Sequence, residues 1–283
     1  MNEQLGFHTM RALCCALQVS RSGYYAWRLR KTKVNPLELV VSQCFAKHSA
    51  RAGAPCLTKD VHACGLVVSQ RTVGRCLARL GLRAKCARKF KATTNSKHKL
   101  PVNENLLGQQ FALSQPNKVW VGDITYIRTT EGWLYLATMI DLFSRQIVGW
   151  QMSSRIDAQL VVDALQAALV NRGHPIGVMI HSDQGVQYCS KAFRKIIKVN
   201  QLVQSMSRKG NCWDNAVAES FFASLKKQAI YGTPLTTREQ TRQIVFEYIE
   251  CYYNRARRHS NNGWLSPVEF ERLYQQSLEN LCV

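Results

Sequence analysis

Between residues 118 and 225 the hydrophobic pattern of the chain changes in a fixed order, and this order limits the folds available to it. Three runs rich in Val, Ile, Tyr, Trp and Thr are separated by short turns, which predicts an antiparallel meander of strands at 118–128, 132–142 and 145–153. The next segments alternate between helical and strand patterns: 157–171, 177–181, 190–199, 202–205, and a long helix from about residue 213. We therefore expect a mixed sheet flanked by helices.

Three strands followed by helix, strand, helix, strand and helix is the order of an RNase H-like α/β fold with a five-stranded mixed sheet. The first third of the chain reads instead as small all-α modules, and residues 91–116 turn polar, as a linker would. The predicted units are an N-terminal helical segment at 1–33, a helix-turn-helix-like domain at 34–95, a linker at 96–117, the catalytic core at 118–232 and a basic helical segment at 233–283.

The charge of the chain indicates a polyanionic partner. There are 38 Lys and Arg against 18 Asp and Glu, a formal net charge of +20. Nucleic acid is the usual partner of so basic a protein, although a merely basic soluble protein is the plain alternative. Ser69 is placed to cap a helix on which Arg71, Arg75 and Arg79 recur every four residues. The stretch 71–99 holds ten Lys or Arg and no acid, which favours DNA contact over a solvated helical face.

The cysteines and the hydropathy suggest where the chain works. Eleven cysteines without a CxxC pair fit reduced thiols in a cytoplasmic protein. No apolar run approaches the roughly 20 residues that cross a bilayer, and the first residues do not resemble a secretory signal. The remaining alternative is a zinc site whose spacing matches no usual pattern, drawn from Cys44, His48, Cys56, His62 and Cys64. Small buried cysteines are the simpler interpretation.

Three acidic residues fall where neighbouring elements of the predicted fold would bring them together. Asp123 lies in the apolar first strand, Asp183 follows the fourth strand, and Glu219 lies in the long last helix. An unpaired carboxylate in a buried strand is costly, which favours a functional role for Asp123. Asp183 alone is equally well a strand-to-turn cap, and Glu219 alone is an ordinary helix residue. The functional interpretation rests on all three acids occurring in this order along the predicted fold.

Three carboxylates in this arrangement can hold two Mg²⁺ or Mn²⁺ ions against a phosphodiester, since such ions prefer oxygen ligands. The sequence therefore predicts an enzyme that cuts and joins DNA, with Asp123, Asp183 and Glu219 as catalytic residues and metal ligands. Asn215 and Lys226 share the helix face of Glu219, at i−4 and i+7, and would meet DNA in the same cleft.

Other polar residues around the predicted site receive lesser roles. Arg208 and Lys209 lie in a basic, glycine-containing loop ahead of the long helix, which would suit a flap that orders on DNA. Asp141 is interpreted as structural, paired with Arg145. His181 either orients a ligand or fills the end of its strand.

The motifs HSDQGVQY, SMSRKGNCWDNAVAESFFASLKK and YNRARRHSNNGWLSPVEFE resemble the integrase-core transposases of insertion-sequence family three, and in particular their second-reading-frame product. The resemblance covers essentially the whole chain and is strongest over 120–270. It implies a metal-binding triad of Asp123, Asp183 and Glu219, with Lys226 on the terminal DNA. It also implies nicking by water and direct attack by the freed 3′-hydroxyl, with no covalent protein–DNA intermediate.

The same resemblance implies partners. These are double-stranded DNA from the element ends and the target, further copies of the chain on that DNA, and a first-reading-frame protein, joined in many such elements by a frameshift fusion. The expected location is the bacterial cytoplasm, on the nucleoid. The stretch RAGAPCLTKDVH and the tail SNNGW depart from common family patterns. A DNA-binding regulator, a hydrolytic nuclease of the same fold and an inactive remnant of an element remain as rival interpretations.

Overall fold

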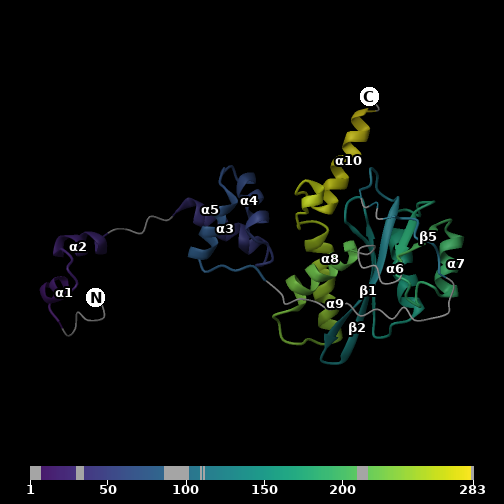
Figure 1. The fold of residues 1–283 in the computed structure, drawn as a ribbon, viewed down its shortest axis with the longest axis horizontal. Helices are drawn as coiled ribbons and strands as arrows, with labels where there is room; N and C mark the ends of the chain where they lie inside the picture. Colours follow the sequence, from purple (N-terminus) through teal and green to yellow (C-terminus); the bar gives the residue numbers. More distant parts are fainter. Residues whose placement is uncertain are drawn as a thin grey trace.

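The computed structural model describes residues 8–29, 35–85, 102–108, 110, 112–208 and 216–281, and its centre is a five-stranded sheet in the order β3-β2-β1-β4-β5 (Figure 1). The strands pair antiparallel from β1 to β2 and from β2 to β3, and parallel from β1 to β4 and from β4 to β5. Their bounds are Val119–Thr129 (β1), Gly132–Asp141 (β2), Ile147–Ser153 (β3), Met179–Ser182 (β4) and Val203–Met206 (β5). The mixed sheet of the predicted RNase H-like fold is confirmed.

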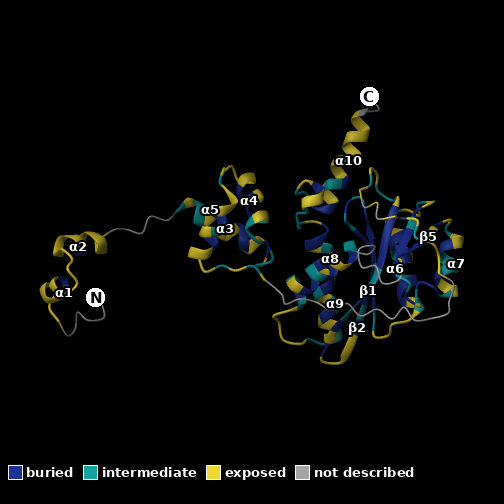
Figure 2. Ribbon diagram, viewed as in Figure 1, coloured by how far each residue is buried: buried dark blue, intermediate teal, exposed yellow. Residues whose placement is uncertain are grey.

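Helices cover both faces of this sheet. One hydrophobic core joins the sheet to α6 (Ala158–Asn171) and α7 (Lys191–Val199). The other joins it to α8 (Ala216–Leu225), α9 (Arg238–Phe246) and the π-helical segments η3 (Lys226–Ile230) and η4 (Glu247–Tyr253). Figure 2 shows that buried residues concentrate in the central strands and on the helix faces that meet them.

Local capping explains where the two helices on the first face begin. Asp157 precedes α6 and accepts a hydrogen bond from Leu160 N at 3.1 Å, and Ser190 precedes α7 and accepts one from Phe193 N at 3.1 Å. Each cap satisfies an amide that has no partner inside its helix. The predicted helices at 157–171 and 190–199 therefore begin at their capping residues.

A small three-helix module with its own apolar core precedes the sheet. It consists of α3 (Pro36–Lys47), α4 (Ala54–Ala63) and α5 (Gln70–Arg79), packed around Val41, Leu57 and Val73. Ser69 caps α5, as predicted, by accepting from Thr72 N at 3.2 Å. Ahead of this module, α1 (Met10–Ala16) and α2 (Arg21–Leu29) contact each other.

The end of the chain is built into the sheet domain. Aromatic residues of η4 belong to the same core as β1 and β2. A short 3-10 turn, η5 (Ser260–Asn262), leads to α10 (Pro267–Leu281), where Glu271 is buried and forms an ion pair with Arg172 at 2.5 Å. Within the described ranges, no helix is long and apolar enough to span a membrane.

Candidate active site

Asp123 and Asp183 are brought side by side by the register of two parallel strands. Gly122 of β1 pairs with Ser182, the last residue of β4, so the next residue of each chain segment is an aspartate. The carboxylate of Asp123 accepts from Ile124 N at 2.8 Å. β4 ends at Ser182 while β1 continues to Thr129, so Asp183 lies at the end of β4 next to the position of Asp123 on β1.

The turn after β4 holds the Asp183 carboxylate through a glycine. Asp183 Oδ1 accepts from Gly185 N at 2.9 Å. A Cβ at position 185 would lie only 2.9 Å from the same oxygen, so glycine is the residue that lets the carboxylate approach this amide. The strand-to-turn cap that the sequence suggested therefore exists, and it orients the side chain proposed to bind metal.

Tyr188 lies beneath both aspartates. Its side chain is buried, with 1% of its surface exposed, and its hydroxyl has no hydrogen-bond partner among the described residues. Burial, followed by the charges of Asp123 and Asp183, raises the pKa of Tyr188 well above its usual value. Gly122 makes room for this ring, since a Cβ there would stand 3.3 Å from Tyr188 Cε1. A buried tyrosine therefore lies under the strand that carries Asp123, and the charges of both aspartates act on its hydroxyl.

The helix α8 and its continuation η3 supply the remaining predicted groups. Glu219 lies in the first turn of α8, and partial burial raises its pKa. Lys226 is only 4% exposed, and its Nζ stands 4.9 Å from the centre of the Tyr126 ring. Burial lowers the pKa of Lys226 to about 8, against the opposing charge of Asp123. Lys226 is thus turned toward β1, and Glu219, seven residues earlier on the same side of the helix, is exposed.

The three acids are not drawn into a single tight cluster. Within the described residues, the set of three His, Cys, Asp or Glu side chains whose ligand atoms all lie within 4.8 Å of one another is His48, Cys56 and Asp60. That set differs from the five-residue zinc alternative, and its Asp60 already accepts hydrogen bonds from His48 at 2.8 Å and from Arg258 at 2.9 Å. The other cysteines of that alternative lie in or beside the module core: Cys44 is buried and Cys64 is exposed.

The predicted DNA-contacting residues lie on exposed parts of the chain where they are described. Arg71, Arg75 and Arg79 are exposed on α5, and Arg79 forms an ion pair with Glu38 at 3.3 Å. Arg208 is exposed at the end of the segment that follows β5. Lys209 and Asn215 lie outside the described residues.

Asp141 and His181 have structural surroundings. Asp141 is buried, and its carboxylate accepts from Asn117 N at 2.7 Å and from Phe143 N at 2.9 Å. It forms an ion pair with Arg172 at 3.9 Å, and Arg145, the partner that the sequence suggested, donates its backbone N–H to the Asp141 carbonyl at 2.8 Å. His181 Nδ1 lies 2.9 Å from Ser205 Oγ, so the ring fills the space between β4 and β5.

Sequence reasoning missed the aromatic part of this site. Tyr188 lies five residues after Asp183 in HSDQGVQY, and Tyr126 lies three residues after Asp123 in VWVGDITYI. An aromatic residue in a strand is ordinary and by itself indicates no functional role. No local signal therefore marked Tyr126 as the partner of Lys226, which is 100 positions away.

Comparison with known proteins places this geometry in a class. Two family models, each described as "Integrase core domain", match residues 114–212 and 219–278. The "Transposase InsF for insertion sequence IS3A" of Escherichia coli (strain K12) is 49% identical, covering 93% of this chain and 94% of that protein. The "Insertion element IS600 uncharacterized 31 kDa protein" of Shigella sonnei is 42% identical, covering 93% and 99%.

A solved structure of the HTLV-2 integrase catalytic core domain in complex with magnesium aligns with a TM-score of 0.43 at 16% identity, covering 55% of this chain and 96% of that chain. The sheet order, its flanking helices and the matched core models define an integrase-core protein. The chain belongs to the IS3 insertion-sequence family of transposases. The resemblance drawn from its motifs is thereby confirmed.

Proposed function

We propose that this transposase cuts and joins DNA at the ends of its own insertion sequence, with Asp123, Asp183 and Glu219 as the metal-binding catalytic residues. The observation that carries the proposal is the β1–β4 register, which pairs Gly122 with Ser182 and so places Asp123 beside Asp183. The nearby face of α8 and η3 adds a third carboxylate and a buried ammonium. A purely structural role gives little reason for two carboxylates on neighbouring interior strands of a sheet.

The donor set fits divalent ions. All three proposed ligands are carboxylates, the ligands that Mg²⁺ and Mn²⁺ prefer, and the neighbouring Tyr188 hydroxyl lacks a hydrogen-bond partner in the described parts of the chain. Two such ions, when bound, would supply positive charge to the phosphoryl group and its attacking and leaving oxygens. The adjacent carboxylates would otherwise repel each other, so an apo site of this kind is expected to bind cations.

The residues of the chain then position the DNA. In the proposed sequence, a water oxygen first attacks the phosphorus at the element end and releases a 3′-hydroxyl. That hydroxyl then attacks a second phosphodiester directly, with no covalent bond between protein and DNA. Lys226 would hold a terminal phosphate beside Asp123, since its pKa of about 8 keeps the ammonium charged at neutral pH.

Further contacts and partners belong to the same proposal. We assign DNA-backbone contact to Arg71, Arg75 and Arg79 on α5, and to Arg208, Lys209 and Asn215 around the segment that precedes α8. Pairing two element ends calls for more than one copy of the chain on DNA. A first-reading-frame protein, supplied separately or as a frameshift fusion, is the proposed second partner.

The test is a strand-transfer assay with Mg²⁺ on labelled DNA that carries the element's ends. It compares the wild-type chain, its fusion to the first-frame protein, and Glu219→Gln in both backgrounds. The change from carboxylate to amide keeps the shape and removes the charge, so we expect joined products to fall at least about a hundredfold. Glu239→Gln, an exposed acid on α9, is the matched control and should retain full joining.

Each of the other assay outcomes would favour one of the alternative functions. Cleavage without joining would indicate a nuclease of the same fold. DNA binding without cleavage or joining, in the fusion as well, would indicate a regulator or an inactive remnant. Equal joining by Glu219→Gln and wild type would remove Glu219 from the site.

A further inference from the structure

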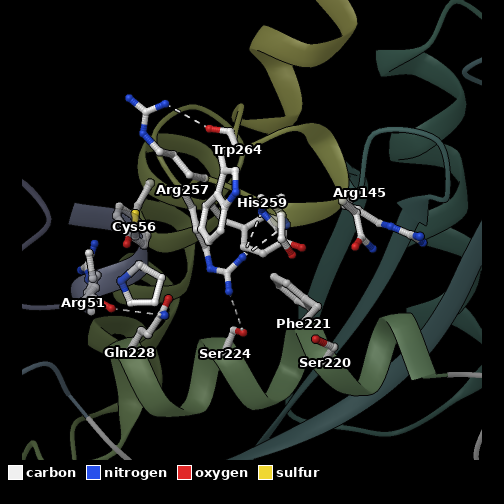
Figure 3. Close-up of a pocket in the computed structure, with 18 of the residues that line it drawn as sticks. Arg51, Cys56, Arg145, Ser220, Phe221, Ser224, Gln228, Arg257, His259 and Trp264 are labelled. Atoms are coloured by element: carbon white, nitrogen blue, oxygen red, sulfur yellow. Dashed lines mark hydrogen bonds between the residues drawn. The ribbon is translucent and has the colours of Figure 1, made fainter. Parts of the chain in front are cut away.

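A second basic site lies against α8, on the face that carries Ser220 and Ser224. A cavity of about 620 Å³ is enclosed by the start of α4, one face of α8 and η3, and the segment that follows η4. Figure 3 shows Ser220, Ser224 and Gln228 rising from the helix into this space, while Arg257 points down toward Ser224 from the C-terminal segment. The cavity therefore combines three regions that are distant in sequence.

The lining of this cavity is strongly cationic. Its described lining includes four arginines and no Asp or Glu: Arg51, Arg145, Arg257 and Arg258. Two of these four arginines form ion pairs with acidic residues that do not line the cavity. Arg51 donates to both carboxylate oxygens of Glu247, at 3.1 and 2.8 Å, and Arg258 donates to Asp60 at 2.9 Å.

Of the other two arginines, Arg145 is influenced by the charge of Asp141, whereas Arg257 faces Ser224 of α8. No ion pair to a carboxylate is found for it among the described residues. Its guanidinium instead donates to Ser224 Oγ at 3.3 Å and to the ring of His259 at 3.1 Å, and it stacks 5.5 Å from the centre of the Tyr253 ring. These neutral partners fix the direction of the guanidinium without cancelling its charge.

His259 helps to keep this charge uncompensated. Burial and the charges of Arg257 and Arg145 lower the pKa of His259 to about 3, so the ring is neutral at physiological pH and accepts from Arg257. A planar guanidinium held in one orientation is the group best suited to bind a phosphate with two hydrogen bonds.

The helix geometry separates this cavity from the proposed catalytic centre. Ser220 and Ser224 are spaced by four residues on one face of α8, and Glu219 and Lys226 are spaced by seven on another, where Lys226 is turned toward β1. The single helix α8 therefore presents one face to the carboxylates and another to the arginines.

We propose that the cavity lined by Arg257, Ser220 and Ser224 binds a phosphodiester of DNA at a second site, distinct from the catalytic carboxylates. The proposal rests on the proposed function in that it takes DNA as the substrate. A free phosphate ion shares this chemistry. Longer nucleic acid is favoured because the rim residues Ser220, Ser260 and Asn261 are exposed, so a strand can leave the cavity. Lys59, 5.8 Å from the centre of the Trp264 ring, extends the positive charge beyond the rim.

The experiment measures DNA binding by the full chain without divalent metal, so that catalysis plays no part. Fluorescence anisotropy of a labelled duplex carrying the element's end is recorded over a series of KCl concentrations. Arg257→Ala should weaken binding roughly three- to tenfold and reduce the salt slope by about 0.9, the value for one phosphate contact on duplex DNA. Arg257→Lys keeps the charge and should recover part of the loss.

A second variant avoids removing any recorded contact. Ser220→Glu places a negative charge at the exposed rim, so it should weaken binding in the same direction while the melting temperature stays at the wild-type value. Arg242→Ala, which removes an arginine on α9 whose ion pair is with Glu239, is the charge-matched control and should leave the slope unchanged.

The possible results separate the two proposals. Wild-type affinity and slope in both Arg257→Ala and Ser220→Glu would overturn the second site and leave the proposed function intact. Failure of the wild-type chain and its first-frame fusion to bind DNA would overturn both. A thermal shift by inorganic phosphate that Arg257→Ala abolishes, combined with unchanged DNA binding, would assign the cavity to a free anion and overturn the DNA proposal.

Discussion

The surroundings of His259 shift the pKa of its imidazole far from the usual value. The ring is buried beside Arg257 and Arg145, and it stacks edge-on against Tyr253 with ring centres 4.9 Å apart. Burial and the two positive charges act in the same direction, so the pKa falls to about 3 from an ordinary value of 6.5. Protonation of His259 is therefore much less favourable in the folded protein than in the unfolded chain.

This shift makes stability depend on pH in a defined window. Because the unfolded state binds more protons between about pH 3 and 6.5, the contribution of His259 is present at neutral pH and is lost as the pH falls through that range. We expect wild type to lose up to about 3 kcal/mol more stability than His259→Gln between neutral pH and about pH 4. Urea unfolding at each pH measures this difference.

Comparing wild type with His259→Gln also cancels the effect of Asp141, whose titration changes stability in the opposite direction. Burial raises the pKa of Asp141 to about 6, so Asp141 favours the folded state as the pH falls below that value, in both proteins equally. Parallel stability curves for wild type and His259→Gln would show that His259 does not titrate in this way.

Between elements, β3 and α6 approach each other closely at a glycine. Gly149 of β3 lies against the backbone of α6, and a Cβ built there would stand 2.4 Å from Ala168 N and 2.5 Å from Ala164 O. Backbone atoms inside a helix cannot move aside as the end of a flexible side chain can. The small residues on both elements thus allow α6 to pack closely against β3.

Gly149→Ala should separate these two elements and lower the free energy of unfolding by about 1–3 kcal/mol. The matched control is Gly74→Ala on α5, where the nearest atom to an added Cβ is Ala54 Cβ at 3.9 Å. There the substitution should raise stability by roughly 0.5–1 kcal/mol, because alanine favours a helix interior. Chemical denaturation of both variants is the measurement, and a loss of similar size at the two sites would contradict the packing argument.

The elements themselves were largely predictable because their signals are local. Strand alternation, the caps Asp157 and Ser190, and the order of segments need only neighbouring residues. The side-by-side placement of Asp123 and Asp183 followed from that order. The π-helical segments η3 and η4 were not predicted, since a register with one extra residue per turn leaves no distinct apolar period.

Contacts between residues distant in sequence could not be predicted, because only the tertiary fold brings them together. The buried carboxylate of Glu271 pairs with Arg172, 99 positions away, and also accepts from Ser144. A neighbour such as Arg145 is the natural guess as a partner for Asp141, but nothing in the sequence indicated that the tertiary fold also brings Arg172 to within 3.9 Å of it. The arginine cavity could not be foreseen either, because its walls come from three separate regions.

Across the whole molecule, two ion pairs connect the α3–α5 module to the sheet domain. Asp60 of α4 accepts from Arg258 at 2.9 Å and from His48 at 2.8 Å, while Arg51 binds Glu247 at the start of η4. Burial alone would raise the pKa of Asp60, but the hydrogen bonds from His48 and Arg258 outweigh it and lower that pKa. Asp60 is therefore charged at neutral pH and holds both sides of the contact.

Asp60→Asn should loosen this contact, because it leaves the Arg258 guanidinium without its carboxylate, at a cost of about 2–3 kcal/mol. Hydrogen exchange followed by mass spectrometry should then show faster exchange in α4 and in the segment after η4, with β1 and β2 unchanged. Asp163→Asn on α6, whose partner Gln159 lies one turn away, is the control. Unchanged exchange in α4 would mean that Asp60 does not hold the module in place.

The aromatic residues of η4 have a consequence at the level of the gene. Tyr248, Tyr252 and Tyr253 lie in the same core as β1 and β2, and Tyr253 packs against Phe221 of α8 with ring centres 4.8 Å apart. A nonsense codon between Lys226 and Tyr248 would therefore remove part of the cover of the sheet, even though every proposed metal ligand is already encoded. Decaying copies of such an element that lose this 3′ stretch would yield an unfolded polypeptide rather than a shorter recombinase.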